Sequence, residues 1–541
     1  MVRSRTVTEA GDEVLDVAIV GGGVAGTYTA WRLLCDAPPP GKPPKIAVFE
    51  GSDRIGGRLL SLKPPGMDHL VCELGGMFFT SVFRHVCGLV KRLGLPVQQM
   101  PHSKQELRYL RRTRLANDAK TVPYDFTDAE RAGSPDDLFA AAIEKLIPGV
   151  LSLHGAALDE RLRTATVDGL PIADWGFWNL LYLQMSSEAF DYTSDTNPDD
   201  YSLINWNAAD AVRSVQVLNV PDIQVFHVTR GYSEIPNAMA AAVEAAGARV
   251  ATKHRLVRFA MEDGLVRLEL AEDSKGWGPA GRGKPVTVYA RKLVLALPRR
   301  SLELLEQTGP LFEDAGVQRM IGSVTPIPMF KMYSCYASPW WKPLGYVPQG
   351  YAITDMPLRA CMYWGTEGDQ PGADPGNTSS LLLTSLDDMM TSSFWAGLRD
   401  PRHSAPFAPR SPLAKTALRR LPGSPKWQQY ADGTTDRIVR EAQRQLSEVH
   451  GIEVPEPYAV ASMSWNEDPF GGAADFWKIH ARSEDVMERI TQPLEGLPVF
   501  VCGDSYSRTQ GWVEGALESA ELMLEKRFGL TGPSWLQTET G

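Results

Sequence analysis

The sequence is short of cysteine and of long apolar runs, and both shortages narrow the range of functions. Its six cysteines are scattered among 541 residues without close pairs. We therefore expect reduced, buried thiols and neither a disulfide framework nor a metal site. No run reaches the roughly 18 apolar residues of a membrane helix. The opening segment MVRSRTVTEAGDEV has no apolar stretch typical of a secretory signal, so we predict a cytoplasmic protein with no membrane partner.

Basic residues are also in deficit. Lysine and arginine number 55 against 65 acidic residues, for a formal net charge of −10, which argues against nucleic acid as a partner. The apolar share of 43% and the charged share of 22% are ordinary for a globular protein. A chain of this length can form two or three domains around a large core.

The strongest local pattern is a glycine-rich turn near the N-terminus. The apolar run VLDVAIV leads into GGGVAG, and KIAVFE follows after a proline-rich loop. Gly21 allows a tight turn, Gly23 lets backbone N–H groups approach a pyrophosphate, and Gly26 lets the helix pack close to the strand. Glu50 ends the second strand, where a carboxylate can accept both hydroxyls of a ribose. This strand–turn–helix–strand context predicts dinucleotide binding.

A second glycine turn favours FAD over NAD. In GSDRIGGRL, Arg58 follows a glycine pair and can neutralise a pyrophosphate. ELGGMFF then carries another pair, Gly75 and Gly76, followed by Met77. With these motifs the chain resembles the FAD-dependent amine oxidase family, which includes the monoamine and L-amino acid oxidases. The resemblance implies a mixed α/β fold, with a Rossmann-like FAD-binding domain, a mixed-sheet substrate domain and a helical insertion.

The expected domains are discontinuous. They are an FAD-binding domain at 14–80, 226–300 and 455–530, a substrate-binding domain at 81–104 and 301–454, and a helical domain at 105–225. Helical periodicity is clearest in TTDRIVREAQRQLSEVHG, which has a capping threonine at its start and a glycine at its end. The Pro-, Gly- and Ser-rich residues 366–433 are interpreted as a surface excursion.

A second flavin block lies near the C-terminus, in LPVFVCGDSYSRTQGWVEGALESAELM. A strand ends at Asp504, whose carboxylate can accept from a ribityl hydroxyl. A helix begins near Gly511, and its N-terminal N–H groups suit the electron-rich edge of a flavin. The block resembles the C-terminal flavin motif of the family. Its pair Gly511–Trp512 is similar to the L-amino acid oxidases, whereas monoamine oxidases usually carry Gly-Tyr.

Two further segments carry residues that the resemblance places at the reaction. GSVTPIPMFKMYSCYASPWW is similar to the family strand with a single lysine, here Lys331, which holds a water against the reactive ring nitrogen of the flavin. ITDMPLRACMYW resembles the L-amino acid oxidases more narrowly, and its matching tyrosine, Tyr363, would bond the substrate carboxylate.

Three positions depart from the family. Phe78 occupies the place of the arginine that pairs with the substrate carboxylate in L-amino acid oxidases. Either another arginine supplies that charge, or the substrate has no carboxylate. Ala473 stands where covalent-flavin members have a cysteine, so the FAD should be non-covalent. Ala474 replaces one wall of the aromatic cage, which leaves Trp512 as the evident wall of a roomy pocket.

Taken together, these motifs predict an L-amino acid oxidase. Hydride leaves Cα for FAD, and the products are a 2-oxo acid, ammonia and hydrogen peroxide. The partners are the amino acid and O2, with a homodimer as the candidate assembly. The alternatives are an amide-forming 2-monooxygenase, an amine oxidase without carboxylate recognition, and a redox-silent flavoprotein that acts as a binding module.

The predicted site residues have three roles. The catalytic residues are Lys331, Tyr363 and Trp512, and the substrate contacts are Phe78, Tyr363, Gly511 and Trp512. The cofactor contacts are Gly21, Gly23, Gly26, Glu50, Arg58, Gly75, Gly76, Met77, Leu256, Asp504, Trp512 and Val513.

Overall fold

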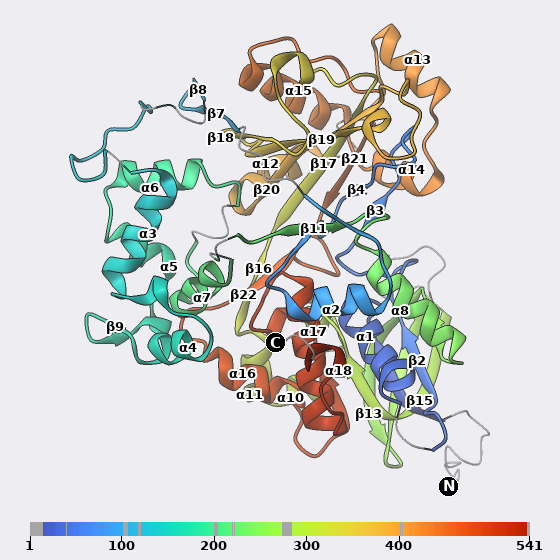
Figure 1. Ribbon diagram of the computed structural model, residues 1–541. Helices are drawn as coiled ribbons and strands as arrows, with labels where there is room; N and C mark the ends of the chain where they lie inside the picture. The colour runs from blue at the N-terminus through green and yellow to red at the C-terminus, as the bar shows by residue number, and fades with distance from the viewer. Residues whose placement is uncertain are drawn as a thin grey trace.

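Two large sheets and a cluster of helices make up the molecule (Figure 1). The computed structural model describes residues 14–38, 41–100, 106–116, 119, 121–131, 133–199, 204–218, 220, 222–272, 284–400, 402 and 404–537. The prediction about a secretory signal was based on residues 1–14. Of these, residues 1–13 lie outside the described residues. Within the described ranges, no helix is both long enough and apolar enough to cross a membrane.

The first sheet has a parallel core. Its parallel strands, in spatial order, are β12 (Arg249–Ala251), β2 (Ile46–Phe49), β1 (Val14–Val20), β15 (Lys284–Leu295) and β23 (Val499–Val501). Parallel strands are buried on both faces, which explains the uninterrupted apolar runs of β2 and β23 and the apolar ends of β1 and β15. The antiparallel hairpin β13 (His254–Glu262) and β14 (Leu265–Glu272) extends the sheet beyond β15.

Three helices from distant parts of the chain cover one face of this sheet. They are α1 (Val24–Trp31), α8 (Glu234–Ala245) and α17 (Val513–Met523), and both α8 and α17 pack against α1 (Figure 1). Ile19 of β1 shares their core with Tyr28 and Leu517. The N- and C-terminal motifs therefore build a single Rossmann-like unit, which confirms the predicted fold class.

The second sheet carries the substrate side. Its strands, in order, are β21 (Ala459–Ser464), β17 (Met329–Tyr336), β20 (Ser380–Asp388), β19 (Ala360–Thr366), β18 (Tyr351–Thr354), β7 (Glu106–Leu110) and β8 (Thr113–Ala116). Helix α15 (Asp436–His450) packs on one face. As the sequence predicts, the Thr435 side chain caps its start, and Gly451 ends it with a φ of 69°. The opposite face packs against the segment around Leu60 and Leu74, next to the glycine turns.

A cluster of helices forms the lobe at the left of Figure 1. It contains α3 (Pro135–Leu146), α4 (Gly155–Thr164), α5 (Phe177–Tyr182), α6 (Ser187–Asp195) and α7 (Ala208–Leu218). Ser134 starts α3 with a capping box, in which its hydroxyl accepts from the N–H of Asp137 while the Asp137 carboxylate accepts from the N–H of Ser134. Phe476 of β22 (Ala474–Trp477) packs into this lobe through Trp206.

Several strands lie outside the expected segments. β20 crosses the middle of the second sheet, fully buried, although residues 366–433 were interpreted as a surface excursion. That interpretation is wrong because the apolar run SLLLTSL outweighs the loop-like composition on either side of it. β21 lies in the second sheet within the 455–530 segment expected beside the nucleotide. β7 pairs with β18 although its residues were expected in the helical domain.

Helix α2 (Arg84–Arg92) packs on the nucleotide side, although residues 81–104 were expected with the substrate sheet. Its Val86 shares a core with Ile19 of β1. The Glu514 carboxylate of α17 accepts from the backbone N–H groups of His85 (3.0 Å) and Val86 (2.9 Å). An acid thus satisfies N–H groups that the first turn of a helix leaves without intrahelical partners. This cap holds α2 against α17.

Candidate functional site

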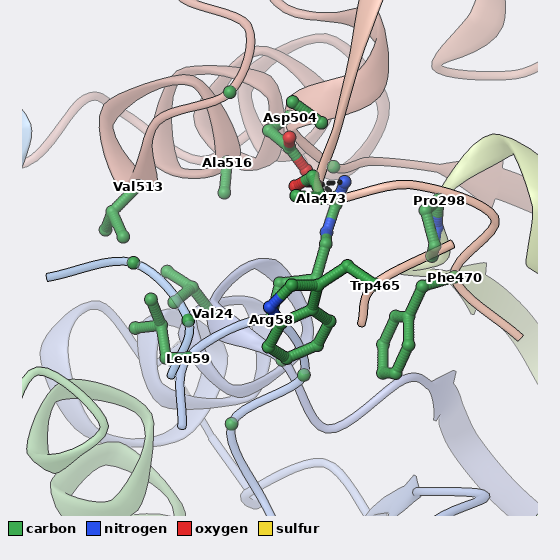
Figure 2. A pocket seen from close by; sticks show the side chains of 18 of the residues that line it. Val24, Arg58, Leu59, Pro298, Trp465, Phe470, Ala473, Asp504, Val513 and Ala516 are labelled. Carbon is green, nitrogen blue, oxygen red and sulfur yellow. Dashed lines mark hydrogen bonds and ion pairs between the residues drawn. The ribbon is translucent and has the colours of Figure 1, made fainter. Parts of the chain in front are cut away.

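A deep pocket joins the two sheets, and its wall is formed by segments far apart in the sequence (Figure 2). Most of the residues that the sequence predicts for the site line this pocket: Gly21, Gly23, Glu50, Arg58, Gly75, Gly76, Met77, Phe78, Leu256, Lys331, Asp504, Gly511, Trp512 and Val513. Two of the predicted residues, Gly26 and Tyr363, are not among those that line it. The pocket runs from the glycine turn after β1 to the N-terminal end of β17, at Met329 and Lys331.

The nucleotide end of the pocket requires glycine for steric reasons. A Cβ atom on Gly21, whose φ is +111°, would lie 2.2 Å from the Ala296 carbonyl oxygen. A Cβ on Gly26 would lie 1.9 Å from the Gly21 carbonyl oxygen, so this glycine allows α1 to pack against the strand, as predicted. Gly23 differs, because the nearest atom to its added Cβ is the Gly57 Cα, 3.8 Å away. Space therefore opens at the N-terminus of α1, where a phosphate would sit.

Glu50 stands at the end of β2 beside this space. Its buried carboxylate accepts from the N–H groups of Gly22 (2.7 Å) and Ser52 (2.8 Å). These bonds orient the acid at the position where a ribose would lie in a dinucleotide-binding fold. A backbone-lined cradle, an open helix N-terminus and an oriented acid are the groups that an adenine dinucleotide needs, so the residues present fit FAD.

Arg58 links the two flavin blocks of the sequence (Figure 2). Its guanidinium forms a close ion pair with Asp504, donates to the Ala473 carbonyl oxygen (3.2 Å) and lies 3.8 Å from the Asp475 carboxylate. Burial raises the pKa of Asp475 to about 6, while Arg58 and the hydroxyl of Ser505 oppose that rise. One arginine therefore serves two buried acids, of which Asp504 lines the pocket.

Helix α17 points its N-terminus into the pocket. Gly511, with a φ of +80°, turns the chain, and Trp512 occupies the N-cap position without a capping side chain. Val513 and Ala516 then line the wall (Figure 2). The positive end of the helix dipole thus faces the pocket, where it favours electron-rich groups.

Lys331 projects from β17 into the same space. Only 3% of the residue is exposed, and its Nζ donates to the Gly75 carbonyl oxygen at 2.6 Å. Burial lowers the pKa of Lys331 to about 8, against the opposing effect of the Glu73 and Asp199 carboxylates. Burial also raises the pKa of Glu73 to about 8. The lysine thus remains largely cationic at neutral pH while its proton is held less firmly than usual.

Aromatic rings surround this end of the pocket. Trp465 and Phe470 lie close together with ring centroids 5.1 Å apart (Figure 2), and the Trp465 indole donates to the Leu74 carbonyl oxygen at 2.8 Å. Phe78 lies against Trp512 at 5.7 Å. Such walls exclude water and hold a flat or apolar group. Trp465 and Phe470 were not predicted as pocket residues, although both lie in the segment SWNEDPFGG, which is rich in aromatic residues and glycine.

Tyr363 is not part of the pocket, which corrects its predicted role as the carboxylate partner. It lies on the face of the second sheet that α15 covers, stacked on Tyr346 at 5.0 Å. Its hydroxyl lies 2.7 Å from His450 Nε2, and the other ring nitrogen of His450 lies 2.7 Å from the Leu446 carbonyl oxygen. Burial lowers the pKa of His450 to about 4, so a neutral imidazole accepts from the phenol. Tyr351, on the neighbouring strand, lines the pocket instead.

Within the described part of the chain, no further arginine is found beside the substrate space to take the role expected of one from elsewhere in the fold. Among the described lining residues the arginines are Arg58 and Arg255. Arg58 is occupied by Asp504, and Arg255 lies on β13 of the nucleotide sheet, next to Leu256. An acid that was not predicted, Asp199, lines the pocket from the segment after α6. Its loop position gives no periodic signal in the sequence.

Comparisons with known proteins agree with this geometry. The profile of a family described as flavin containing amine oxidoreductase matches residues 24–522. The chain is similar to achacin from Lissachatina fulica, with 26% identity over 539 residues that span 95% of this chain and 93% of the relative. It is similar to aplysianin-A from Aplysia kurodai, with 24% identity over 559 residues that span 96% and 91%.

Solved structures share the fold. Wild-type putrescine oxidase bound to putrescine aligns with a TM-score of 0.62 and 15% identity, over 95% of this chain and 99% of that chain. A double mutant of putrescine oxidase aligns with a TM-score of 0.63 and 14% identity. At this level of identity the likeness concerns the arrangement of the elements and carries no information on substrate.

Proposed function

Because the chain belongs to the flavin-containing amine oxidoreductase family, we propose that it catalyses the oxidative deamination of L-amino acids with FAD and O2. The observation that carries the proposal is the position of Lys331, buried in the pocket that also contains the nucleotide cradle. Bound FAD supplies a two-electron acceptor for the hydride of the C–H bond next to the amine, and O2 then takes the electrons as hydrogen peroxide. The imino acid adds water to give a 2-oxo acid and ammonia.

The cofactor is held without a covalent bond in this proposal. Gly21, Gly23 and Glu50 would hold the adenosine and pyrophosphate part, and Asp504 with the N-terminus of α17 would contact the flavin part; all of them line the pocket. No cysteine is found among the described residues that line the pocket. The side chain at position 473 is a methyl group, which cannot form a thioether. All affinity for FAD must then come from hydrogen bonds, charge and packing.

The protein's part in the chemistry is to bind, orient and exclude water. Hydride can leave only from a substrate whose reacting amine is neutral, because its lone pair stabilises the charge that develops on carbon. Trp465, Phe470 and Trp512 enclose this space with apolar surface, which disfavours a charged ammonium there. No strong base is required at the carbon atom, since it loses a hydride and not a proton.

The carboxylate of an amino acid would need a positive partner in the pocket. Lys331 is the described lining cation that lies outside the nucleotide part. The Tyr351 side chain, which also lines the wall, offers a hydroxyl. A single ammonium with a phenol is a weaker carboxylate site than the bidentate fork of an arginine, so we expect moderate affinity for the substrate.

A second candidate is an amine oxidase that does not recognise a carboxylate. It is favoured by one specific observation, namely that neither described lining arginine is available to a substrate. The discriminating experiment compares each amino acid with its decarboxylated amine, L-lysine with cadaverine and L-phenylalanine with phenethylamine, by peroxide release. The proposal expects the amino acid to have the higher kcat/KM in both pairs. Faster turnover of both amines would select the second candidate, and an amide with CO2 among the products would indicate a 2-monooxygenase.

A further inference from the structure

The Trp512 ring, which forms one wall of the pocket, packs against two other aromatic rings. Its centroid lies 4.9 Å from that of Phe83 and 5.7 Å from that of Phe78. Phe83 is only 2% exposed and occupies the N-cap position of α2. Trp512 occupies the N-cap position of α17 and lines the pocket. The place of the Trp512 ring therefore depends on how the start of α2 lies against the start of α17.

A single carboxylate fixes that arrangement. Glu514 follows Trp512 by two residues, in the first turn of α17, and is only 5% exposed. Its Oε2 accepts from the backbone N–H of Val86 at 2.9 Å. Its Oε1 accepts from the backbone N–H of His85 at 3.0 Å and lies 2.9 Å from the Nδ1 atom of the same histidine. The acid thus lies at the N-terminal ends of two helices, and both helix dipoles favour its negative charge.

The imidazole of His85 adds a charged contact to the two backbone bonds. Burial alone would lower the pKa of His85, but the hydrogen bond to Glu514 and the charge of that acid outweigh burial and raise the pKa above its ordinary value. Glu518 and Glu521, also on α17, act in the same direction. The His85 side chain is 21% exposed and that of Glu514 is 6% exposed, so solvent and salt screen the pair only weakly. The pair therefore strengthens the attachment of α2 to α17.

These contacts close a ring. The backbone joins Trp512 to Glu514, Glu514 binds the first turn of α2, and Phe83 at the start of α2 contacts the Trp512 ring. We propose that Glu514 and His85 are positioning residues that set the place of the Trp512 ring in the substrate space. The inference rests on the proposed function, because this wall matters for catalysis only if the substrate binds beside it. Neither positioning residue is among the described residues that line the pocket, so their loss should weaken substrate binding more than it slows the chemical step.

The test follows the Trp512 ring by fluorine NMR, in the FAD-loaded protein labelled with 5-fluorotryptophan. Trp512→Phe identifies the Trp512 signal as the one that disappears. Glu514→Gln keeps the size of the side chain but removes its charge, and it should shift or broaden this signal. It should also raise KM by about 10-fold for any amino acid or amine that wild type oxidises, the lower range for the loss of one charged hydrogen bond, and it should change kcat less. His85→Gln leaves both backbone bonds in place, so it should have a smaller effect in the same direction, and it remains informative if Glu514→Gln does not fold.

A matched control on the same helix separates positioning from a general loss of stability. Glu521 lies about two turns beyond Glu514 on α17, is also 5% exposed, and accepts from Tyr28 at 2.6 Å and Arg32 at 2.5 Å. Glu521→Gln should therefore lower Tm at least as much as Glu514→Gln does, without moving the Trp512 signal. An equal movement of the signal in both variants would overturn the inference.

A second control lies beside His85 on α2. Arg84 donates to the Leu536 carbonyl oxygen at 3.0 Å, so Arg84→Gln should change neither the Trp512 signal nor KM. An unmoved signal in both Glu514→Gln and His85→Gln would overturn the inference, and so would a moved signal with an unchanged KM. If wild type oxidises no amino acid and no amine, the proposed function fails, while the NMR comparison still decides whether the two residues position the ring.

Discussion

Removal of Arg58 should destabilise the protein in a pH-dependent way. The arginine forms an ion pair with Asp504, and its guanidinium lies 3.8 Å from the carboxylate of Asp475. Asp475 is only 2% exposed. Truncation to methionine would leave two buried carboxylates without their cation. Breaking a buried pair from one side costs roughly 3–5 kcal/mol. For a large domain this corresponds to a fall in Tm of roughly 5–10 °C at pH 7.5.

The sign of the pH effect follows from Asp475. Its pKa in the folded protein is about 6, raised from an ordinary value of 3.8 mainly by burial. The folded state therefore binds this proton more tightly than the unfolded state, and stability is lost as pH rises from about 4 through about 6. Two pKa units correspond to about 3 kcal/mol over that window. Without Arg58 the folded pKa rises further, so the loss continues to higher pH.

The assay is a thermal unfolding series at pH 5 and pH 7.5, with and without saturating FAD. Arg58→Met should be far less stable than wild type at pH 7.5 and closer to it at pH 5. Adding Asp504→Asn should recover part of the loss. The exposed pair of Arg300 and Asp468, 2.6 Å apart, supplies the control, since Arg300→Met should cost at most about 1 kcal/mol. A Tm deficit of Arg58→Met that is the same at both pH values would refute the reasoning.

Further predictions concern the cofactor, the lysine and the two tyrosines. Acid precipitation should release all the flavin, and colour left in the pellet would contradict non-covalent binding. Glu50→Ala should weaken FAD retention, measured by equilibrium dialysis, because each lost bond to a charged acceptor is worth about 1.5–3 kcal/mol. Lys331→Met should slow reoxidation in stopped-flow traces; the wild-type rate should fall as pH rises through about 8, where Lys331 loses its proton. Glu73→Gln should move that inflection to lower pH, because the Glu73 carboxylate raises the pKa of Lys331. If Lys331→Met has the same pH profile as wild type, the titration belongs to another group. Tyr363→Phe should keep kcat/KM within about twofold of wild type. It should lower the free energy of unfolding by about 1–3 kcal/mol, because the hydrogen bond to His450 is lost. Tyr351→Phe should reduce kcat/KM more strongly.

Short-range patterns in the sequence were sufficient for the nucleotide half of the fold. In this half the glycine spacing determines the geometry directly, because a Cβ at Gly21 or Gly26 would overlap neighbouring backbone. The acid at the end of β2 follows from the same local unit. The second half depends on strand pairing between distant segments, which composition does not reveal. Residues 380–388 illustrate this, since their apolar run favours a strand but only the pairing with β17 and β19 makes it a central one.

The misassignment of Tyr363 has a specific physical origin. In a strand, successive side chains point to opposite faces of the sheet, so a motif that is aligned one residue out places a side chain on the wrong face. Met362 of β19 packs toward the pocket side with Tyr351, while Tyr363 packs beneath α15. The sequence shows apolar or aromatic residues on both faces of this strand, since both are covered, and it therefore contains no alternation from which to choose. Asp199 is the opposite case: it lies in a loop, and Arg359, 160 positions further along the chain, donates to the carbonyl oxygens of Ser194 and Asn197 just before it. Contacts of that kind join segments far apart in the chain, so no local pattern in the sequence predicts them.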